Sequence, residues 1–380
     1  MRTAVHPRTG GLLPMAAALA LFCVAGCDRG PAEEKTERLS SPVVGEEGKT
    51  VAGVERSGDE EHLVRNNERL GHAYERIWAT TISPDGESVA AIARRDDKHV
   101  VLRDGKEAGT YDKVGSVEYT PDGSLLVQAY AKKKAYVMKD GEQIGGAYDS
   151  VRKPVVSPTG AVVFSATRDG KTFIVEDGKQ ASETYEAAWS PRFSKKSQAM
   201  AYVACKRVGG PSGAPRCFLI VDGKPVSKGY MRIDSWDFAP DGRSVAFIAM
   251  MDYQKVLVVN GEEVGKPFLA DDVSGPTFSP GGGTVAIAVG FGGTWQLMKG
   301  GRKHGTEFTA SSVADLLFSP DGSRIACTVI EGDRWYVRKD EAPASDRFDR
   351  ITDLRNSQDG TTLLATGIKG RMSVPIEVEW

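Results

Sequence analysis

The sequence predicts an all-β fold made of repeated four-stranded antiparallel units. Two observations carry this prediction: a Ser-Pro-Asp-Gly turn recurs along the chain, and an Asp-Gly turn follows most of its copies. The first copy is Ile82-Ser83-Pro84-Asp85-Gly86, and the small aliphatic run Val89-Ala90-Ala91-Ile92-Ala93 comes after it. Self-similarity at a fixed period is the signature of a repeat architecture.

The first turn has eight copies. From proline to proline, with Gln358 standing in the last copy, they are separated by 37, 37, 33, 49, 40, 40 and 38 residues. Ser or Thr opens a type I turn, Pro sets φ at the second position, and Gly takes the last position. A large apolar residue precedes most copies and a small aliphatic pair follows, so each copy is predicted to be strand, tight turn, strand.

The second turn predicts two more strands per unit. Asp-Gly or Asn-Gly between apolar runs is the strongest short hairpin signal, because a type I′ turn needs two positive φ values. Its copies begin at Asp104, Asp140, Asp177, Asp222 and Asn260. An aromatic residue then opens the next unit, and we expect it to pack between units; its copies are Tyr74, Tyr111, Tyr148, Tyr185, Tyr230, Phe268, Phe308 and Phe348. Four antiparallel strands repeated radially make a β-propeller, here of eight blades or, alternatively, seven.

The repeats resemble the WD40-like propeller repeats of the SPDG type, which occur in TolB and in the propeller domains of prolyl oligopeptidases. The resemblance covers roughly residues 72–380 and is carried by the first turn and its two strands. It implies the fold rather than a partner.

Residues 1–26 have the pattern of a secretory signal. Arg2 and Arg8 precede an apolar run from Leu12 to Gly26, which is shorter than the ~20 residues of a membrane span. The end of this run, Val24-Ala25-Gly26-Cys27, resembles the lipobox of bacterial lipoproteins. That resemblance implies an acylated Cys27 and a protein anchored to the inner or outer membrane of a bacterial envelope, outside the cytoplasm.

The next segment, residues 27–61, is predicted to be a disordered acidic tether. From Asp28 to Glu61 it holds ten acids, five bases and few large apolar residues. The propeller is predicted to occupy residues 62–380. We expect the N-terminal segment from His62 to supply outer strands of the last blade, which closes the ring in a monomer.

Cysteine usage fits an exported protein. Cys205 and Cys217 flank an insertion, and we predict a disulfide between them. Cys327 lies in an apolar strand and is expected to be a buried free thiol.

Catalytic motifs are missing from the sequence. It contains no G-x-S-x-G elbow and no H-E-x-x-H or C-x-x-C metal spacing. We therefore predict no catalytic residues, metal site or cofactor, and a non-enzymatic binding or scaffold role. The alternative is a propeller lyase or glycosidase with its site at the central channel. Nucleic acid is not expected as a partner of an exported protein.

The predicted binding surface is a set of basic hairpin tips between the second and third strands of the blades. Over seven tips we count 15 bases and six acids, and such a surface steers anionic partners. The residues assigned to it are Arg94, Arg95, Lys98, Lys132, Lys133, Lys134, Arg168, Lys171, Lys206, Arg207 and Arg216. We expect an envelope protein or an anionic glycan or lipid to bind there; the alternative is that these tips are merely solvated.

Overall fold

The computed structural model describes residues 40–45, 49–210, 213–370 and 372–380, and these form 36 β-strands. The chain divides into two compact units, one ending at Val127 and the other running from Gln128 to Trp380. The signal segment and Cys27 lie outside the described residues. In the part of the chain that is described, no helix has the length and hydropathy needed to cross a membrane.

The first unit contains two complete four-stranded sheets, each with its strands in sequence order. The first sheet is β1 (Ser40–Val44), β2 (Val51–Ser57), β3 (Glu60–Arg65) and β4 (Glu68–Tyr74). The second is β5 (Arg76–Ile82), β6 (Val89–Arg95), β7 (Lys98–Arg103) and β8 (Lys106–Tyr111). β9 (Lys113–Tyr119) follows, and the border between the units falls within β10 (Leu125–Ala131); the order of that sheet is β12-β11-β10-β9.

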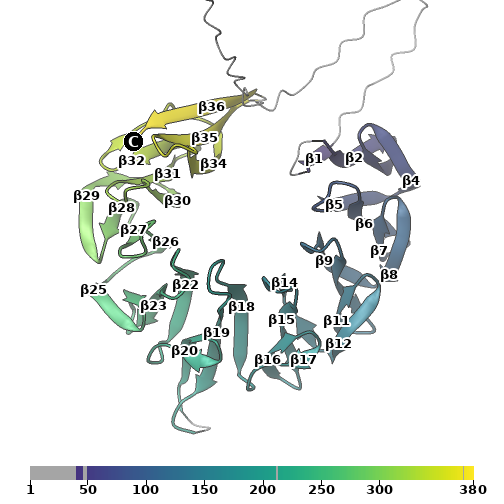
Figure 1. Cartoon of the computed structure of the whole chain (residues 1–380), viewed down its shortest axis with the longest axis horizontal. Helices are drawn as coiled ribbons and strands as arrows, with labels where there is room; N and C mark the ends of the chain where they lie inside the picture. The colour runs from purple at the N-terminus through teal and green to yellow at the C-terminus, as the bar shows by residue number, and fades with distance from the viewer. Residues whose placement is uncertain (1–39, 46–48, 211–212, 371) are drawn as a thin grey trace, which may run out of the picture. The chain divides into compact units, whose positions relative to one another are not determined.

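The second unit continues the pattern, sheet after sheet (Figure 1). Its strands begin with β11 (Lys134–Lys139), β12 (Glu142–Tyr148), β13 (Ser150–Val151), β14 (Val155–Val156), β15 (Val162–Arg168), β16 (Lys171–Glu176), β17 (Lys179–Gln180), β18 (Ala187–Phe193), β19 (Met200–Arg207), β20 (Pro215–Val221) and β21 (Lys224–Pro225). They continue with β22 (Arg232–Phe238), β23 (Val245–Met251), β24 (Gln254–Val259), β25 (Glu262–Phe268), β26 (Asp272–Phe278), β27 (Val285–Phe291), β28 (Thr294–Lys299) and β29 (Arg302–Thr309). The last are β30 (Ser312–Phe318), β31 (Ile325–Glu331), β32 (Arg334–Lys339), β33 (Ala342–Pro343), β34 (Arg350–Asn356), β35 (Thr362–Lys369) and β36 (Met372–Glu379).

Consecutive sheets of the second unit stack face to face. Alternate residues of β23 point to opposite faces of its sheet. Val245, Phe247 and Ala249 pack against the sheet β18–β21, whereas Ala246 and Ile248 pack against the sheet β26–β29. The second strands are therefore buried on both faces, and each large side chain buried in this way contributes ~1.5–3 kcal/mol. The stacking confirms the expected fold class, an all-β propeller of antiparallel blades.

The recurring aromatic residue has the packing role expected of it. Tyr185, Tyr230 and Phe348 each lie in an apolar cluster that joins two consecutive sheets. The number of blades is not confirmed, because the described residues form nine sheets and not eight.

The N-terminal segment differs from the expectation. β1 and β2 lie within the residues expected to form a disordered tether, and β1 to β4 hydrogen-bond to one another as a sheet of their own. Ala52 and Val54 are buried with Leu63, while Glu55 and Glu60 remain at the surface. The acidic composition of this segment predicted disorder, although β2 has one apolar face that is buried in the sheet. Among the described residues, the last sheet has only β34, β35 and β36.

The first turn owes its sequence to a closed set of hydrogen bonds. In the copy at Ser319, the amide of Gly322 donates to the Ser319 carbonyl at 2.8 Å, and the amide of Arg324 donates to Ser319 Oγ at 3.0 Å. Ser319 Oγ itself donates to the Asp321 carboxylate, and Ser319 is only 3% exposed. The hydroxyl and the carboxylate thus satisfy backbone groups at the start of the second strand.

The second turn uses its Asp or Asn in a similar way. Asp340 takes this position in a unit where Glu341 replaces the Gly, so it was not among the predicted copies. Its φ is 46°, and its Oδ1 accepts the amide of Ile325, the first residue of β31, at 2.9 Å. Asn260 accepts the amide of Val245 at 2.9 Å in the same manner. The preference for Asp or Asn therefore reflects both the left-handed backbone and a hydrogen bond to the neighbouring strand.

Candidate functional site

Two surfaces of the units differ in how their loops are built. The hairpin surface comprises the hairpins between second and third strands, together with the linkers from each fourth strand to the next first strand. The turn surface comprises the two recurring turns. Loops carry binding residues more often than the strands that support them, because strand side chains are committed to packing.

In the first unit, the three predicted binding residues of the hairpin surface are all paired with acids. Arg94 Nη2 lies 2.7 Å from Asp97 Oδ1, and Lys98 contacts Asp112. Arg95 Nη2 donates to Glu107 Oε2 at 3.0 Å. This hydrogen bond lowers the pKa of Glu107.

In the second unit, many of the predicted bases are also engaged. Lys134 pairs with Asp149 at 2.6 Å, Lys206 with Glu183 at 2.7 Å, and Arg207 with Glu186 at 2.8 Å. The guanidinium of Arg168 lies over the ring of Tyr148, 5.0 Å from its centroid. Lys132 and Lys133 occupy the two left-handed positions of an exposed tip, with φ of 50° and 60°.

Three of the pairing acids, Asp112, Asp149 and Glu186, come from a position that the count of hairpin tips omitted. An acid directly follows the recurring aromatic in five units, as Glu75, Asp112, Asp149, Glu186 and Asp349. Asp149 Oδ1 accepts Lys134 of one sheet at 2.6 Å, and its Oδ2 accepts the amide of Asp169 in the next sheet at 2.7 Å. The hydrogen bond from Lys134 lowers the pKa of Asp149. Many of the hairpin bases therefore hold sheets together, and the aromatic-acid dipeptide was the sequence signal for this.

Three predicted bases of the second unit have neither an ion pair nor a ring contact among the described residues. They are Lys133, Lys171 and Arg216. Lys133 and Lys171 are exposed, and Arg216 is half-buried beside the disulfide-linked strand β20. A partner could engage these bases of the second unit without breaking an ion pair or a ring contact.

A cavity of about 340 Å³ in the first unit lies beside Arg94. Its other lining residues were not predicted as binding residues from the sequence. It is lined by Arg76, Trp78, Arg94 and His99. The Trp78 and His99 rings meet edge to face, with centroids 5.0 Å apart. His99 Nδ1 accepts the amide of Val114 at 3.0 Å, and burial lowers the pKa of His99. Its neutral imidazole therefore carries the proton on Nε2.

Cys205 and Cys217, the pair expected to be bridged, face each other across β19 and β20 and form a disulfide. The bridge lies at the base of the hairpin that contains residues 206–216. Cys327 is a buried free thiol, and burial raises its pKa to about 12. A thiol with such a pKa is inert at neutral pH.

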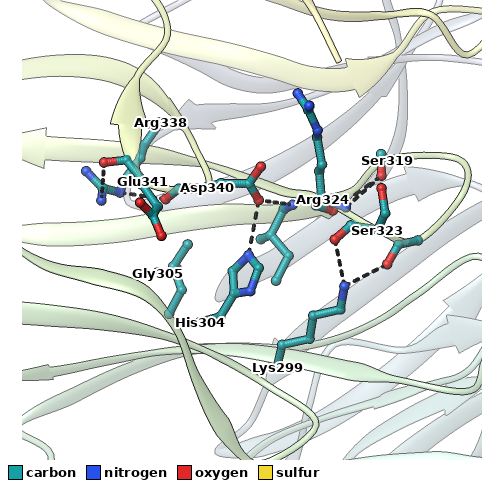
Figure 2. Close-up of polar contacts among 12 residues, drawn as sticks. Lys299, His304, Gly305, Ser319, Ser323, Arg324, Arg338, Asp340 and Glu341 are labelled. Atoms are coloured by element: carbon teal, nitrogen blue, oxygen red, sulfur yellow. Dashed lines mark hydrogen bonds and ion pairs between the residues drawn. The ribbon is translucent and has the colours of Figure 1, made fainter.

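The turn surface of the second unit is a junction between sheets (Figure 2). Lys299 Nζ reaches from β28 to the next sheet, where it donates to the carbonyl oxygens of Gly322 and Ser323 at 2.9 and 2.7 Å. His304 Nε2 lies 3.1 Å from Asp340 Oδ1 of that sheet. These side chains are used in contacts within the protein.

A cavity of about 490 Å³ also opens on the turn surface, between Asp321, Arg324, Gly360 and Trp380. The Asp321 carboxylate in this cavity accepts hydrogen bonds from the Ser319 hydroxyl and from the amide of Ser323, both within the turn. Over all described residues, no group of three or more His, Cys, Asp or Glu side chains is placed to hold a metal ion.

No protein-family model matches this chain, and no curated protein sequence does. Solved structures similar to it include a eukaryotic initiation factor, with 13% identity, coverage of 84% of this chain and 90% of that chain, and a TM-score of 0.49. The β-propeller domain of the Trilobed protease from Pyrococcus furiosus is 14% identical, with 82% and 95% covered and a TM-score of 0.35. TolB from Acinetobacter baumannii is 15% identical, with 55% and 56% covered and a TM-score of 0.30. Identities this low do not carry a function from one chain to another.

Proposed function

We propose that this chain is an exported, lipid-anchored β-propeller of the SPDG, TolB-like repeat type that binds a partner in the bacterial cell envelope without catalysing a reaction. The partner is an envelope protein or an anionic glycan or lipid, held at the hairpin surface. Acylation of Cys27 after removal of residues 1–26 supplies the anchor, since each buried CH₂ of an acyl chain contributes ~0.8 kcal/mol.

The observation that carries the proposal is the contrast between the two surfaces. The turn surface repeats one hydrogen-bonded turn from unit to unit, as at Ser319 and Ser357. The hairpin surface varies in length, charge and apolar content, and its longest hairpin is braced by the Cys205–Cys217 disulfide. A scaffold with one uniform and one variable surface is expected to bind through the variable one.

The bases without ion pairs provide a clean test. Charge reversal at Lys133, Lys171 and Arg216 to Glu changes the hairpin surface without breaking an ion pair. The matched control reverses Lys179, Lys224 and Arg302, three exposed bases beside the second turns on the turn surface.

We expect the first triple variant, and not the control, to lose recovery of envelope components captured from native membranes at low salt. Recovery by the unchanged protein should fall as salt rises, because exposed charges are screened beyond ~8 Å at physiological ionic strength. Equal recovery by both triple variants would show that Lys133, Lys171 and Arg216 do not take part in binding. The anchor is tested separately: Cys27→Ser should move the protein out of the detergent phase, and equal partitioning would exclude acylation.

A further inference from the structure

The exposed apolar side chains of the second unit gather on the hairpin surface. Met231, Tyr253, Leu269 and Phe291 are 44%, 85%, 54% and 56% exposed, and they belong to two consecutive sheets and the linkers that precede them. We call these four residues the apolar hairpin patch. At these exposed fractions the four side chains together expose on the order of 500 Å² of surface. The largest apolar patch on a typical monomer has about this area and is often functional.

Backbone contacts bring the four residues of the patch onto neighbouring loops. The amide of Met231 donates to the carbonyl of Met250 at 3.0 Å, which places Met231 beside the hairpin that carries Tyr253. Leu269 follows Phe268, which pairs with Lys255 at the base of the same hairpin.

The linker then passes to the next hairpin. The amide of Gly292 donates to Asp271 Oδ2 at 2.8 Å, so Asp271 lies against the tip that follows Phe291. The linker from Leu269 to Asp271 thus joins the hairpins of Tyr253 and Phe291.

Three members, Met231, Leu269 and Tyr253, depart from the pattern of other units. Met231 occupies the place of the acid that follows the aromatic in units such as that of Asp149. Leu269 lies in a longer linker, since Asp271 makes the tip contact that Asp349 makes directly after Phe348.

Tyr253 departs most, because it takes a left-handed turn position with φ of 69°. That conformation suits Gly, Asn or Asp, and bulky residues rarely adopt it. Strain of this kind gathers at functional sites.

The charges beside the patch are acidic. Asp252, Asp271 and Asp272 are exposed, and none of them pairs with a base among the described residues. The nearby Arg232 and Lys255 share one carboxylate, Asp234, so these three groups carry a net charge of +1 and the six charged groups together sum to −2. This excess of carboxylates repels an anionic membrane and attracts a basic partner.

The exposed area of the apolar hairpin patch also limits the kind of partner that can bind there. A standard protein interface buries ~800 Å² on each side, which is more than this patch offers to a second folded copy. A short segment needs less. We therefore propose that the apolar hairpin patch binds a protein segment in which an apolar or aromatic side chain lies between basic residues. This inference rests on the proposed function. Of the partners proposed there, it selects a protein and places its binding site on this part of the hairpin surface.

The test uses the full chain and a random 12-residue peptide library displayed on phage. Selection is made on the unchanged protein, with counter-selection on Tyr253→Gly. We expect recovered peptides to carry an aromatic or aliphatic residue flanked by Lys or Arg. Synthetic copies of these peptides, measured by fluorescence anisotropy, should bind Tyr253→Gly and Phe291→Ser at least tenfold more weakly. Asp252→Asn should weaken binding less and flatten its salt dependence.

The matched control is Met372→Ser. Met372 is also apolar, 67% exposed and on the hairpin surface, but it belongs to the sheet β34–β36, and its replacement should leave affinity unchanged.

Several results would overturn the proposal. They are selection of acidic peptides, selection of none, or equal binding by Tyr253→Gly. Phosphatidylglycerol vesicles that sediment with the unchanged protein and not with Tyr253→Gly would assign the patch to a membrane, and a dimer lost in that variant would assign it to a second copy. Peptides lost by the Lys133, Lys171 and Arg216 triple reversal but kept by Tyr253→Gly would refute the patch and leave the proposed function standing.

Discussion

Replacing Tyr253 by Gly should make the protein more stable. Tyr253 is 85% exposed, so little packing is lost with its ring, and its φ of 69° carries a left-handed cost of roughly 1–2 kcal/mol for a residue with a Cβ. Gly removes that cost, but its unfolded chain has more conformational freedom, and losing this freedom on folding costs roughly 0.5–1 kcal/mol. Taking the middle of each range, the net gain is about 0.7 kcal/mol in the free energy of unfolding.

The assay is differential scanning calorimetry of the variant beside the unchanged chain. A unit of about 250 residues unfolds with an entropy near 2.1 cal/mol/K per residue, so the gain raises Tm by about 1–2 °C. Tyr253→Ala is the matched comparison, because it removes the ring and keeps the left-handed cost, and we expect no rise in Tm. Tyr253→Asn tolerates this conformation and should behave as Gly does. Equal Tm values for the Gly, Asn and Ala variants would refute the argument from backbone strain.

Two further predictions concern the disulfide and the first turn. Cys205→Ala with Cys217→Ala should lower the free energy of unfolding by about 2–3 kcal/mol, measured by urea denaturation, and thiol titration of the denatured unreduced protein should find neither cysteine reactive. Asp321, whose pKa is lowered from 3.8 to about 2 chiefly by the Ser319 hydrogen bond, stabilises the fold above pH 3.8, and this contribution disappears as the pH falls through 2. Asp321→Asn should therefore show a smaller drop in Tm between pH 5 and pH 2 than the unchanged protein; an identical profile would show that this carboxylate does not stabilise the turn.

Local sequence determined the repeated unit of this protein. A Ser-Pro-Asp-Gly turn and an Asp-Gly or Asn-Gly turn draw on backbone preferences and hydrogen bonds within a few residues, so the copies at Ser319 and Asn260 could be recognised without the fold. The disulfide partners could be chosen in the same way, since Cys205 and Cys217 flank one hairpin. The sheet β1–β4 escaped recognition because the acids of residues 27–61 outweighed the single apolar face that Ala52 and Val54 provide.

Only the tertiary structure decided what the hairpin residues do. Asp149 lies 15 residues from Lys134 and 20 from Asp169 along the chain, yet it contacts both, because the sheets stack and bring linker and hairpins together. A count of tip charges cannot include such an acid, so it reported a basic surface where many of the bases are paired. The apolar hairpin patch was hidden for the same reason: Met231, Tyr253, Leu269 and Phe291 are far apart in sequence, and their exposure depends on which strands cover them.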